Sequence, residues 1–299
     1  MSAPALPAIL LTGVNGQVGF ELARTLQGLG RVVALDRQAL DLRDLERVRS
    51  VLRELRPAVV VNPAAYTAVD RAEDERDEAH HLNAALPATL AEECARTNAW
   101  LVHYSTDYVF DGAKDTPYVE SDAVAPLNVY GETKLAGEQA IAASGCRYLI
   151  LRTSWVYGAR GANFMRTILR LAEQRPELTI VADQFGAPTW SRTIAELSAG
   201  MLSQIGYAER TRPGSADALS GLYHLTNGGR TSWCEFAGEI LRVWGKTEQT
   251  RVTPIPASAY PVKARRPVNS CLSNAKLAAA FGLAAPDWRH ALELCAQQT

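Results

Sequence analysis

The chain has 299 residues, of which 47% are hydrophobic and 21% charged, and its formal net charge is −1. This composition is that of an ordinary globular protein, and the near-neutral charge without a long Lys and Arg block argues against nucleic acid as a partner. No apolar run approaches the length of a membrane-spanning helix, so we expect no membrane segment.

The chain begins with an apolar run, residues 8–13, that has no charged segment before it and ends in a glycine turn, which predicts a first strand and not a signal peptide. The cysteines are odd in number and have no C-x-x-C spacing, so we predict neither a disulfide framework nor a zinc site, and we expect a cytoplasmic protein with reduced thiols. They are Cys94, Cys146, Cys234, Cys271 and Cys295.

Short apolar runs alternate with amphipathic segments through the first half of the chain. The amphipathic segments 18–30 and 44–56 are long enough for crossover helices. Near-continuous apolar runs are typical of strands buried on both faces, and their alternation with helices predicts an α/β fold with a doubly wound parallel sheet. The five predicted strands are 8–13, 31–36, 58–63, 100–105 and 147–152.

The pattern changes after about residue 155, where most prolines and loop-forming residues lie. A chain of this length accommodates two packed domains. We predict a Rossmann-like dinucleotide-binding domain over residues 1–155, to which about 186–227 return, and a smaller α/β substrate-binding portion over 156–299.

The turn after the first strand reads TGVNGQVG, with Gly13, Gly16 and Gly19 three residues apart. Glycines let a backbone approach a pyrophosphate at a helix N-terminus, although three glycines also suit a plain strand-to-helix turn. Asp36 ends the second strand, where a carboxylate could bind the adenosine ribose, and Arg37 beside it suits a 2′-phosphate. The pair leaves the choice between NAD and NADP open.

Tyr130 and Lys134 lie four residues apart in a segment of helical composition, so they share one helix face. In one interpretation Lys134 simply pairs with Glu138. In the other, the ammonium lowers the pKa of the phenol toward the working range of an acid–base group. Thr106 at the end of the fourth strand adds a hydroxyl where open α/β sheets bind ligands.

The segments GQVG, YTAVDRAE, STDYVFDG, YGETKLAGE, RTSWVYG, DQFGAPT and GRTSWCEFA follow one another in this order. As an ordered set over about residues 9–290, they resemble the extended short-chain dehydrogenase/reductase family. The branch they resemble reduces the C4 ketone of dTDP-4-dehydro-L-rhamnose to dTDP-L-rhamnose with NADPH or NADH. Related dehydratases carry an acid pair after the threonine, whereas here Asp107 is followed by Tyr108, so elimination is not expected.

The resemblance implies specific residue roles. Thr106, Tyr130 and Lys134 would be catalytic, and Tyr130 and Lys134 would also contact the cofactor. Thr106, Asp107, Trp155 and Arg266 would bind the sugar nucleotide, with Lys263 and Arg265 near its diphosphate. The remaining cofactor-binding residues would be Gly13, Gly16, Gln17, Val18, Asp36, Arg37, Asp41, Leu42, Ala64, Ala65, Tyr66, Thr67 and Tyr104.

Two alternatives stay open from the sequence. The chain could reduce or epimerise another nucleotide sugar, or it could be a non-catalytic NAD(P)-binding subunit like the regulatory subunit of methionine adenosyltransferase. His80 and His81 are adjacent and the other histidines are isolated, so no metal site is predicted, although a structural Mg²⁺ between the subunits of a homodimer would leave no trace in the sequence.

Overall fold

The structure is a computed structural model that describes residues 6–298. Within these residues six parallel strands form a central sheet in the order β10-β5-β4-β3-β1-β2. The doubly wound α/β prediction is therefore confirmed. The strands are β1 (Ala8–Leu11), β2 (Arg31–Ala34), β3 (Val59–Asn62), β4 (Trp100–Thr106), β5 (Arg147–Thr153) and β10 (Gly221–His224).

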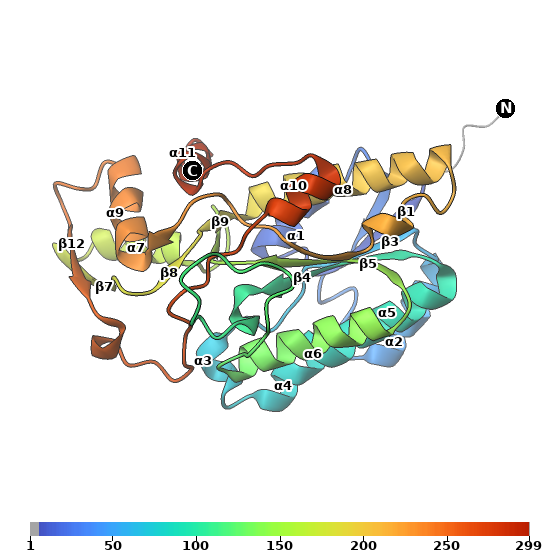
Figure 1. Ribbon diagram of the computed structural model, residues 1–299, viewed down its shortest axis with the longest axis horizontal. Helices are drawn as coiled ribbons and strands as arrows, with labels where there is room; N and C mark the ends of the chain where they lie inside the picture. The colour runs from blue at the N-terminus through green and yellow to red at the C-terminus, as the bar shows by residue number, and fades with distance from the viewer. Residues whose placement is uncertain (1–5, 299) are drawn as a thin grey trace.

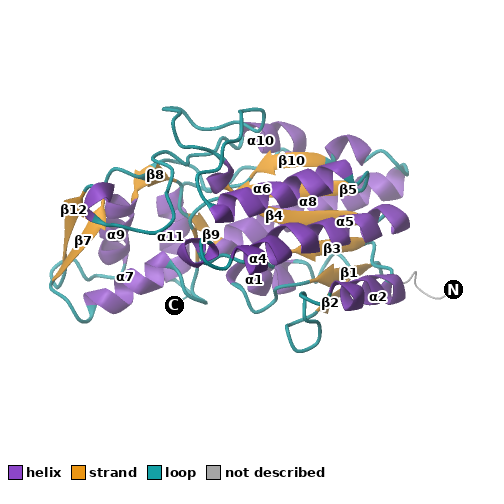
Figure 2. Cartoon of the chain, turned by 90° about the horizontal axis from the view of Figure 1, so that it is seen from below, coloured by secondary structure: helices purple, strands orange, loops and turns teal. Residues whose placement is uncertain are grey.

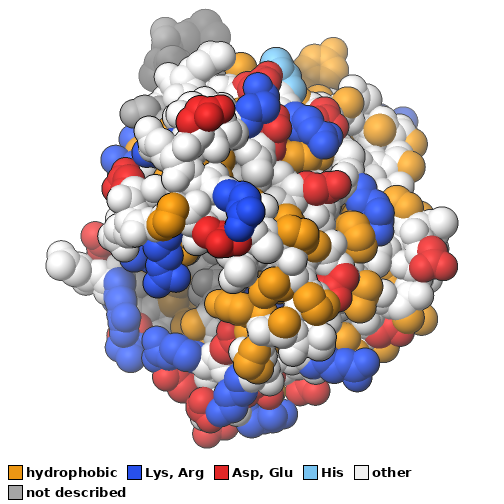
Figure 3. Space-filling view, turned by 90° about the vertical axis from the view of Figure 1, so that its left-hand side faces the viewer, with side chains coloured by type: hydrophobic (Ala, Val, Ile, Leu, Met, Phe, Trp, Pro, Cys, Tyr) orange, Lys and Arg blue, Asp and Glu red, His pale blue; other side chains and the backbone are white. Residues whose placement is uncertain are grey.

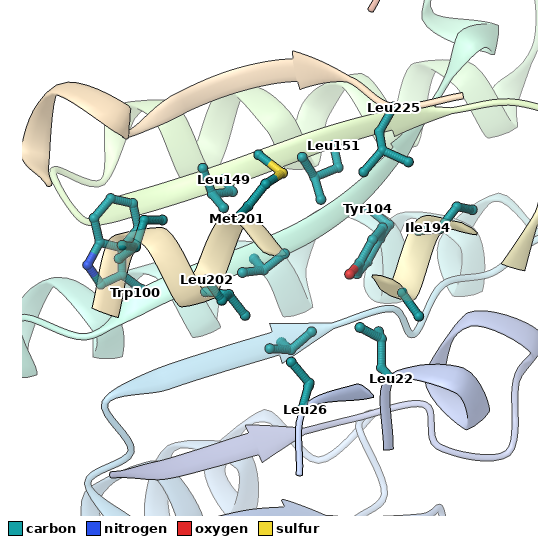
Figure 4. Close-up of a cluster of buried hydrophobic side chains, with 14 of the residues drawn as sticks. Leu22, Leu26, Trp100, Tyr104, Leu149, Leu151, Ile194, Met201, Leu202 and Leu225 are labelled. Atoms are coloured by element: carbon teal, nitrogen blue, oxygen red, sulfur yellow. The ribbon is translucent and has the colours of Figure 1, made fainter. Parts of the chain in front are cut away.

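Helices cover both faces of this sheet (Figure 1). On one face lie α1 (Gln17–Thr25), α8 (Ser191–Thr211) and α10 (Ala275–Phe281). On the other face lie α2 (Leu45–Leu55), α5 (Leu86–Thr97) and α6 (Val129–Ala143). Figure 4 shows the first interface, where Leu22 of α1 and Ile194 and Met201 of α8 face Leu149 and Leu151 of β5.

The prediction that residues 31–36 form a strand buried on both faces was wrong. β2 lies at the edge of the sheet, and its terminal residues Arg31 and Ala34 are exposed. A run of apolar letters does not distinguish an edge strand from a central one, because an edge strand can also be rich in β-branched residues.

The strand order reverses at β1, which has β2 on one side and β3 on the other. In open α/β sheets, ligands bind beyond the carboxyl ends of the strands at such a reversal. Two elements from beyond residue 186 join this sheet: α8 packs on α1, and β10 pairs with β5. We infer a first domain formed by 6–155 together with these two elements, and α10 joins it by packing Phe281 against Tyr223.

The second portion lies beyond the carboxyl ends of the sheet (Figure 2). Its core contains Phe236, Trp288 and Leu292. Its outer face carries interspersed basic and acidic side chains (Figure 3), in keeping with the near-neutral net charge. Its elements are β6 (Val156–Tyr157), α7 (Phe164–Ala172), β7 (Glu177–Val181), β8 (Phe185–Gly186), β9 (Thr189–Trp190), β11 (Thr231–Ser232), α9 (Trp233–Val243), β12 (Arg251–Ile255) and α11 (Trp288–Ala296).

Several short elements connect the parts of the fold. They are α3 (Val69–Ala72), α4 (Arg76–His80), the π-helix η1 (His81–Ala85) and the 3-10 turns η2 (Asp107–Val109), η3 (Asp217–Leu219) and η4 (Ala257–Ala259). The five cysteines are free thiols. In the described part of the chain, no helix has the length and apolar character needed to cross a membrane.

Candidate active site

Two positions in the turn after β1 and the first turn of α1 have room only for glycine. Gly13 has φ +57°, and a Cβ there would lie 2.9 Å from the backbone nitrogen of Ala64. A Cβ on Gly19 would collide with the carbonyl of Gly13. α1 then starts at Gln17, and no side chain caps it. A close-approaching turn at an uncapped helix N-terminus fits a pyrophosphate, which needs backbone N–H donors.

A cleft of about 200 Å³ opens next to this turn, between it and the loops that follow β2 and β3. Arg43, Glu78 and Leu82 complete its wall. Many of the predicted cofactor residues line it, and they are Gly13, Gly16, Asp36, Arg37, Asp41, Leu42, Ala64 and Ala65. The cleft is therefore placed and lined as an adenosine diphosphate subsite requires.

The loop after β2 is held in shape by its own carboxylates. Asp36 accepts hydrogen bonds from the backbone N–H groups of Gln38 and Ala39, at 3.0 and 2.9 Å. Asp41 binds the guanidinium of Arg43 at 2.6 Å. Hydrogen bonds from Arg43 lower the pKa of Asp41 below its usual range, so this carboxylate stays ionised at neutral pH.

The side chains of three predicted cofactor-binding residues do not point into the cleft. The side chain of Gln17 accepts from Asn163 at 2.8 Å and reaches the carbonyl of Val156. Val18 packs its side chain against the core, and Thr67 is exposed. Gln17 and Val18 can therefore serve a phosphate through their backbone N–H groups, and Thr67 lies outside the lining of the cleft.

Tyr66 is fixed at both its backbone and its side chain. Asn83 accepts from the N–H of Tyr66 at 2.9 Å and donates to its carbonyl at 3.1 Å. The phenol donates to Glu75 at 2.5 Å. Asn83 lies in the π-helix η1, an insertion that often marks functional sites because it turns a side chain out of the regular helical register.

Thr106 and Tyr130 come together at the carboxyl end of β4. Thr106 is the last residue of β4, its hydroxyl donates to Asp107 at 2.9 Å, and it lies near enough to the Tyr130 phenol to favour the ionised form of that phenol. Tyr108 meets the Tyr130 ring edge-on, with 5.8 Å between ring centres. Two hydroxyls from β4 and α6 thus face one point, as orientation and protonation of a carbonyl oxygen require.

Lys134 is buried beneath this pair. Its Nζ donates to the carbonyl of Tyr104 at 2.6 Å and lies 3.0 Å from Nε2 of His103. Glu138 does not hydrogen bond to Lys134, because both of its oxygens bind Arg152 of β5. The simple i,i+4 pair of Lys134 and Glu138 considered from the sequence is therefore not formed.

The pKa of the Tyr130 phenol differs from the sequence-based expectation. Burial raises it to about 12, the nearby Thr106 hydroxyl opposes this, and the charge of Asp107 adds to it. Burial lowers the pKa of Lys134 to about 8, opposed by Glu138. The pKa of the phenol is therefore raised and not lowered as expected, because burial dominates.

Asp107 is a buried carboxyl next to the hydroxyl pair. Burial raises its pKa to about 7. Its Oδ1 accepts from Thr106, and the nearby Ser270 hydroxyl also favours the ionised form, whereas its Oδ2 is buried with no hydrogen bond of ordinary geometry. An unpartnered carboxyl oxygen at this point suits a substrate hydroxyl, since an unmade buried hydrogen bond is costly.

The start of α6 is locked by three contacts. The side chain of Asn128 accepts from the N–H of Gly131 at 2.8 Å and donates to the carbonyl of Arg265 at 2.8 Å. Glu73 accepts from the N–H of Val129. A Cβ on Gly131 would collide with the carbonyl of Tyr108. This glycine therefore lets α6 bring Tyr130 up to β4.

The ring of Tyr104 lies in the core and not at the cleft. It sits among the apolar side chains between the sheet and α8, near Leu22 and Ile194, and its hydroxyl donates to Ser198 at 2.8 Å (Figure 4). Because successive side chains of a strand point to opposite faces, Tyr104 faces away from Lys134. The ring of Tyr104 is therefore not part of the cleft, and its carbonyl accepts from Lys134, so a cofactor contact by Tyr104 stays a prediction.

Trp155 is half-buried and has a left-handed backbone, with φ +46°. Its ring stacks on Trp233 with 3.4 Å between centres, and a Cβ on Gly186 would touch it at 2.5 Å. One ring face is thus covered by Trp233. A sugar could reach only the part of this side chain that Trp233 leaves open.

Of the three basic residues near 265, Arg266 lies close to Tyr108. It pairs with Asp70 at 2.7 Å, and its charge favours the ionised form of the Tyr108 phenol. Its Nε is buried without a partner. Lys263 pairs with Asp74, and Arg265 is exposed. Among the described residues, no group of three or more His, Cys, Asp or Glu side chains is arranged to hold a metal ion.

The family model described as "RmlD substrate binding domain" matches residues 7–299. A dTDP-4-dehydrorhamnose reductase of Burkholderia thailandensis is 50% identical over 293 residues, which cover 96% of this chain and 97% of the relative. This chain belongs to the dTDP-4-dehydrorhamnose reductase family.

Two further comparisons agree with this membership. A dTDP-4-dehydrorhamnose reductase of Escherichia coli strain K12 is 44% identical over 289 residues, which are 94% of each chain. The crystal structure of such a reductase from Bacillus anthracis, in complex with NADP, has a TM-score of 0.88 at 35% identity and covers 98% of this chain and 99% of its own.

Three residues that shape the site of this family member were missed from the sequence. Asn83 holds Tyr66, Asn128 caps α6, and His103 contacts Lys134. Asn128 could have been found as an N-cap, because Asn is favoured directly before a helix. His103 lies two residues before Ser105 in β4, so strand alternation predicts that both side chains lie on the same face of the sheet. No local signal marks Asn83.

Proposed function

We propose that this chain reduces the C4 ketone of dTDP-4-dehydro-L-rhamnose to dTDP-L-rhamnose with NADPH or NADH, as a step of dTDP-rhamnose biosynthesis. The observation that carries the proposal is the proximity of Thr106, at the carboxyl end of β4, to Tyr130, one helical turn from the buried Lys134. Family membership over nearly the whole chain supports the substrate.

The chain's own residues supply orientation and a proton. Thr106 donates to the ketone oxygen and orients it, and Tyr130 transfers its phenolic proton to that oxygen as the carbon becomes tetrahedral. The bound nicotinamide would supply the hydride to C4. One hydride and one proton convert the ketone to a secondary alcohol. Lys134 stabilises the phenolate that remains and binds the nicotinamide ribose.

The cofactor would lie across the strand-order reversal. The turn from Gly13 to Gly16 and the first N–H groups of α1 would bind its pyrophosphate, and the loop after β2 would bind its adenosine. Arg37 is exposed and lines the cleft, which supports binding of a 2′-phosphate and so of NADPH. NADH would use Asp36 at the same place.

The sugar nucleotide would enter from the second portion. The free Oδ2 of Asp107 would accept from a sugar hydroxyl, Trp155 would border the sugar, and Arg266 would face the diphosphate. A homodimer, with or without a structural Mg²⁺, stays part of the proposal. Its test is the molar mass by light scattering with Mg²⁺ and then with EDTA.

The experiment that tests this function measures oxidation of NADPH and NADH by the purified chain. The substrate is made in place by an upstream dehydratase and epimerase, and the sugar product is identified. Tyr130→Phe is the matched variant, and we expect it to lower kcat by about two orders of magnitude or more with cofactor affinity nearly unchanged.

The two alternatives appear as distinct outcomes of that experiment. Turnover with another 4-keto sugar nucleotide, but not with this one, would keep the chemistry and replace the substrate. Cofactor binding without oxidation of any ketose, together with a stable complex with a methionine adenosyltransferase, would replace the enzyme by a regulatory subunit. Equal turnover of Tyr130→Phe and the native chain would remove Tyr130 from its role.

A further inference from the structure

A chain of buried polar side chains runs from Lys134 into the sheet. His103 of β4 lies opposite Asn62 of β3 in the strand register, and both are fully buried. Nδ1 of His103 lies 3.1 Å from the carboxamide Nδ2 of Asn62. The hydroxyl of Thr12, the residue after β1, donates to the carboxamide Oδ1 of Asn62 at 2.6 Å. Lys134 contacts the other imidazole nitrogen at 3.0 Å.

These three hydrogen bonds can run in only two directions. If Lys134 is an ammonium, Nε2 of His103 must accept, so Nδ1 carries the proton and donates to the carboxamide oxygen of Asn62, whose NH₂ then donates to Thr12. If the chain runs the other way, Nε2 carries the proton and donates to a neutral lysine amine. The structure places the NH₂ of Asn62 toward His103 and its oxygen toward Thr12, so the first direction requires the carboxamide to be turned by half a rotation. The two ends of a carboxamide are alike in shape, so its hydrogen-bond partners decide between the two orientations.

The charge of Lys134 selects the first direction. A lysine with an ordinary pKa is an ammonium at neutral pH, and Lys134 keeps that charge at pH 7 although burial has lowered its pKa to about 8. Burial and the neighbouring ammonium hold the pKa of His103 well below its usual range, so the imidazole stays neutral. A neutral imidazole beside an ammonium can only accept from it.

We propose that His103 is a positioning residue for Lys134: its neutral Nδ1–H tautomer, fixed by Asn62 and Thr12, offers Nε2 as an acceptor that keeps the ammonium charged and in place. With the carbonyl of Tyr104, this fixes two of the three N–H groups of Lys134. The third is left for the catalytic side. The kinetic consequence of this inference rests on the proposed function. The direction of the hydrogen bonds does not depend on that function.

The other titratable groups around α6 are engaged with partners of their own. They are Glu138 with Arg152 of β5, Glu132 with Arg76 of α4, Glu93 of α5 with Arg53, Asp107 of η2 with Thr106, Glu73 beyond α3 with the N–H of Val129, and Tyr130 with Thr106. His103 is the titratable side chain in hydrogen-bond contact with Lys134, whereas Glu138, which is engaged with Arg152, acts on Lys134 through its charge.

The kinetic arm compares three variants across pH. In the reduction direction, kcat/KM falls at alkaline pH as the coupled pair of Tyr130 and Lys134 loses its proton. His103→Leu removes an acceptor of the Lys134 ammonium, so we expect this alkaline limb of the pH profile to move to lower pH by about one unit. His103→Gln keeps an acceptor and should restore the native limb. Asn62→Asp should move it to higher pH, because a carboxylate strengthens the Nδ1–H tautomer.

A merely structural role would lower kcat or the melting temperature in all three variants without moving the limb. That result would overturn the proposal, and so would an acidward shift for Asn62→Asp. Circular dichroism melting curves check that each variant is folded.

The second arm does not need turnover. Nitrogen-15 spectra of histidine-labelled native protein, with His103→Gln to identify the signal, report which imidazole nitrogen of His103 is protonated. We expect Nδ1–H, neutral, at about pH 6 to 7, where Lys134 carries its charge. An Nε2–H signal would overturn the proposal even in an active enzyme. A native chain that shows Nδ1–H and turns over no ketose would refute the proposed function alone.

Discussion

Arg152 of β5 binds both carboxylate oxygens of Glu138 of α6, at 2.9 and 2.6 Å, with both side chains about 4% exposed. The pair joins the sheet to the helix that carries Tyr130 and Lys134, one helical turn beyond the lysine. It fixes how α6 lies on the sheet, and it explains why Lys134 finds its partners in β4.

Glu138→Gln should strongly destabilise the chain. The substitution leaves the Arg152 guanidinium buried without its counter-charge, which typically costs about 3–5 kcal/mol of unfolding free energy. The measurement is urea unfolding, with Glu132→Gln as the matched control on the same helix. Glu132 pairs with Arg76 at the surface, so its loss should have almost no effect. Equal stabilities of the two variants would contradict this account.

Gly131→Ala should lower kcat by at least about tenfold, because the added methyl meets the carbonyl of Tyr108 and pushes Tyr130 away from Thr106. The control is Gly238→Ala in α9, where nothing lies within 4 Å of the added Cβ. There the better helix propensity of alanine should leave the enzyme as active and as stable as before, or slightly more stable. Initial rates and thermal melts distinguish the two, and native-like kcat in Gly131→Ala would refute the steric argument.

Asp107→Asn should change how stability depends on pH. The folded-state pKa of Asp107 is raised from 3.8 to about 7, so the folded chain holds a proton that the unfolded chain loses in this interval. Native stability therefore falls as pH rises from about 4 to 7, by up to about 4 kcal/mol from this group. Denaturant unfolding at several pH values should show the variant gaining on the native chain over that interval. A constant difference would mean that Asp107 is ionised throughout.

Arg37→Ala should raise KM for NADPH about tenfold, the worth of one charge-assisted contact to the 2′-phosphate. NADH lacks that phosphate and is the internal control, since its KM should stay unchanged. Steady-state rates with both cofactors decide the matter. A parallel rise for both would show that Arg37 shapes the loop after β2 and does not read the phosphate.

Periodicity and motif spacing predicted the sheet, its crossover helices and the segments that meet at its carboxyl edge. Thr106 ends β4 and Tyr130 lies in the first turn of α6, so both residues lie at that edge. The boundaries of the strand and the helix alone could indicate this relation. Gly13 and Asp36 line one cleft for the same reason.

What sequence reasoning missed depends on which way a side chain points and on what is packed above it. Tyr104 was predicted to bind the cofactor, yet strand alternation turns its ring to the α8 face while its neighbour His103 faces α6. The stacking of Trp155 on Trp233 joins residues that are remote in sequence, and the same is true of Arg152 and Glu138. Such contacts follow from packing and not from local spacing.

The hydrogen bond between Gln17 and Asn163 carries a kinetic consequence. Gln17 opens the helix that would bind the pyrophosphate, and Asn163 caps α7 at the start of the second portion. A ligand that settles on the first turn of α1 therefore also steadies α7, so we expect ordered addition, with the dinucleotide before the sugar nucleotide. Dead-end inhibition by dTDP that is uncompetitive toward NADPH would bear this out, a competitive pattern would refute it, and Gln17→Ala should weaken the order.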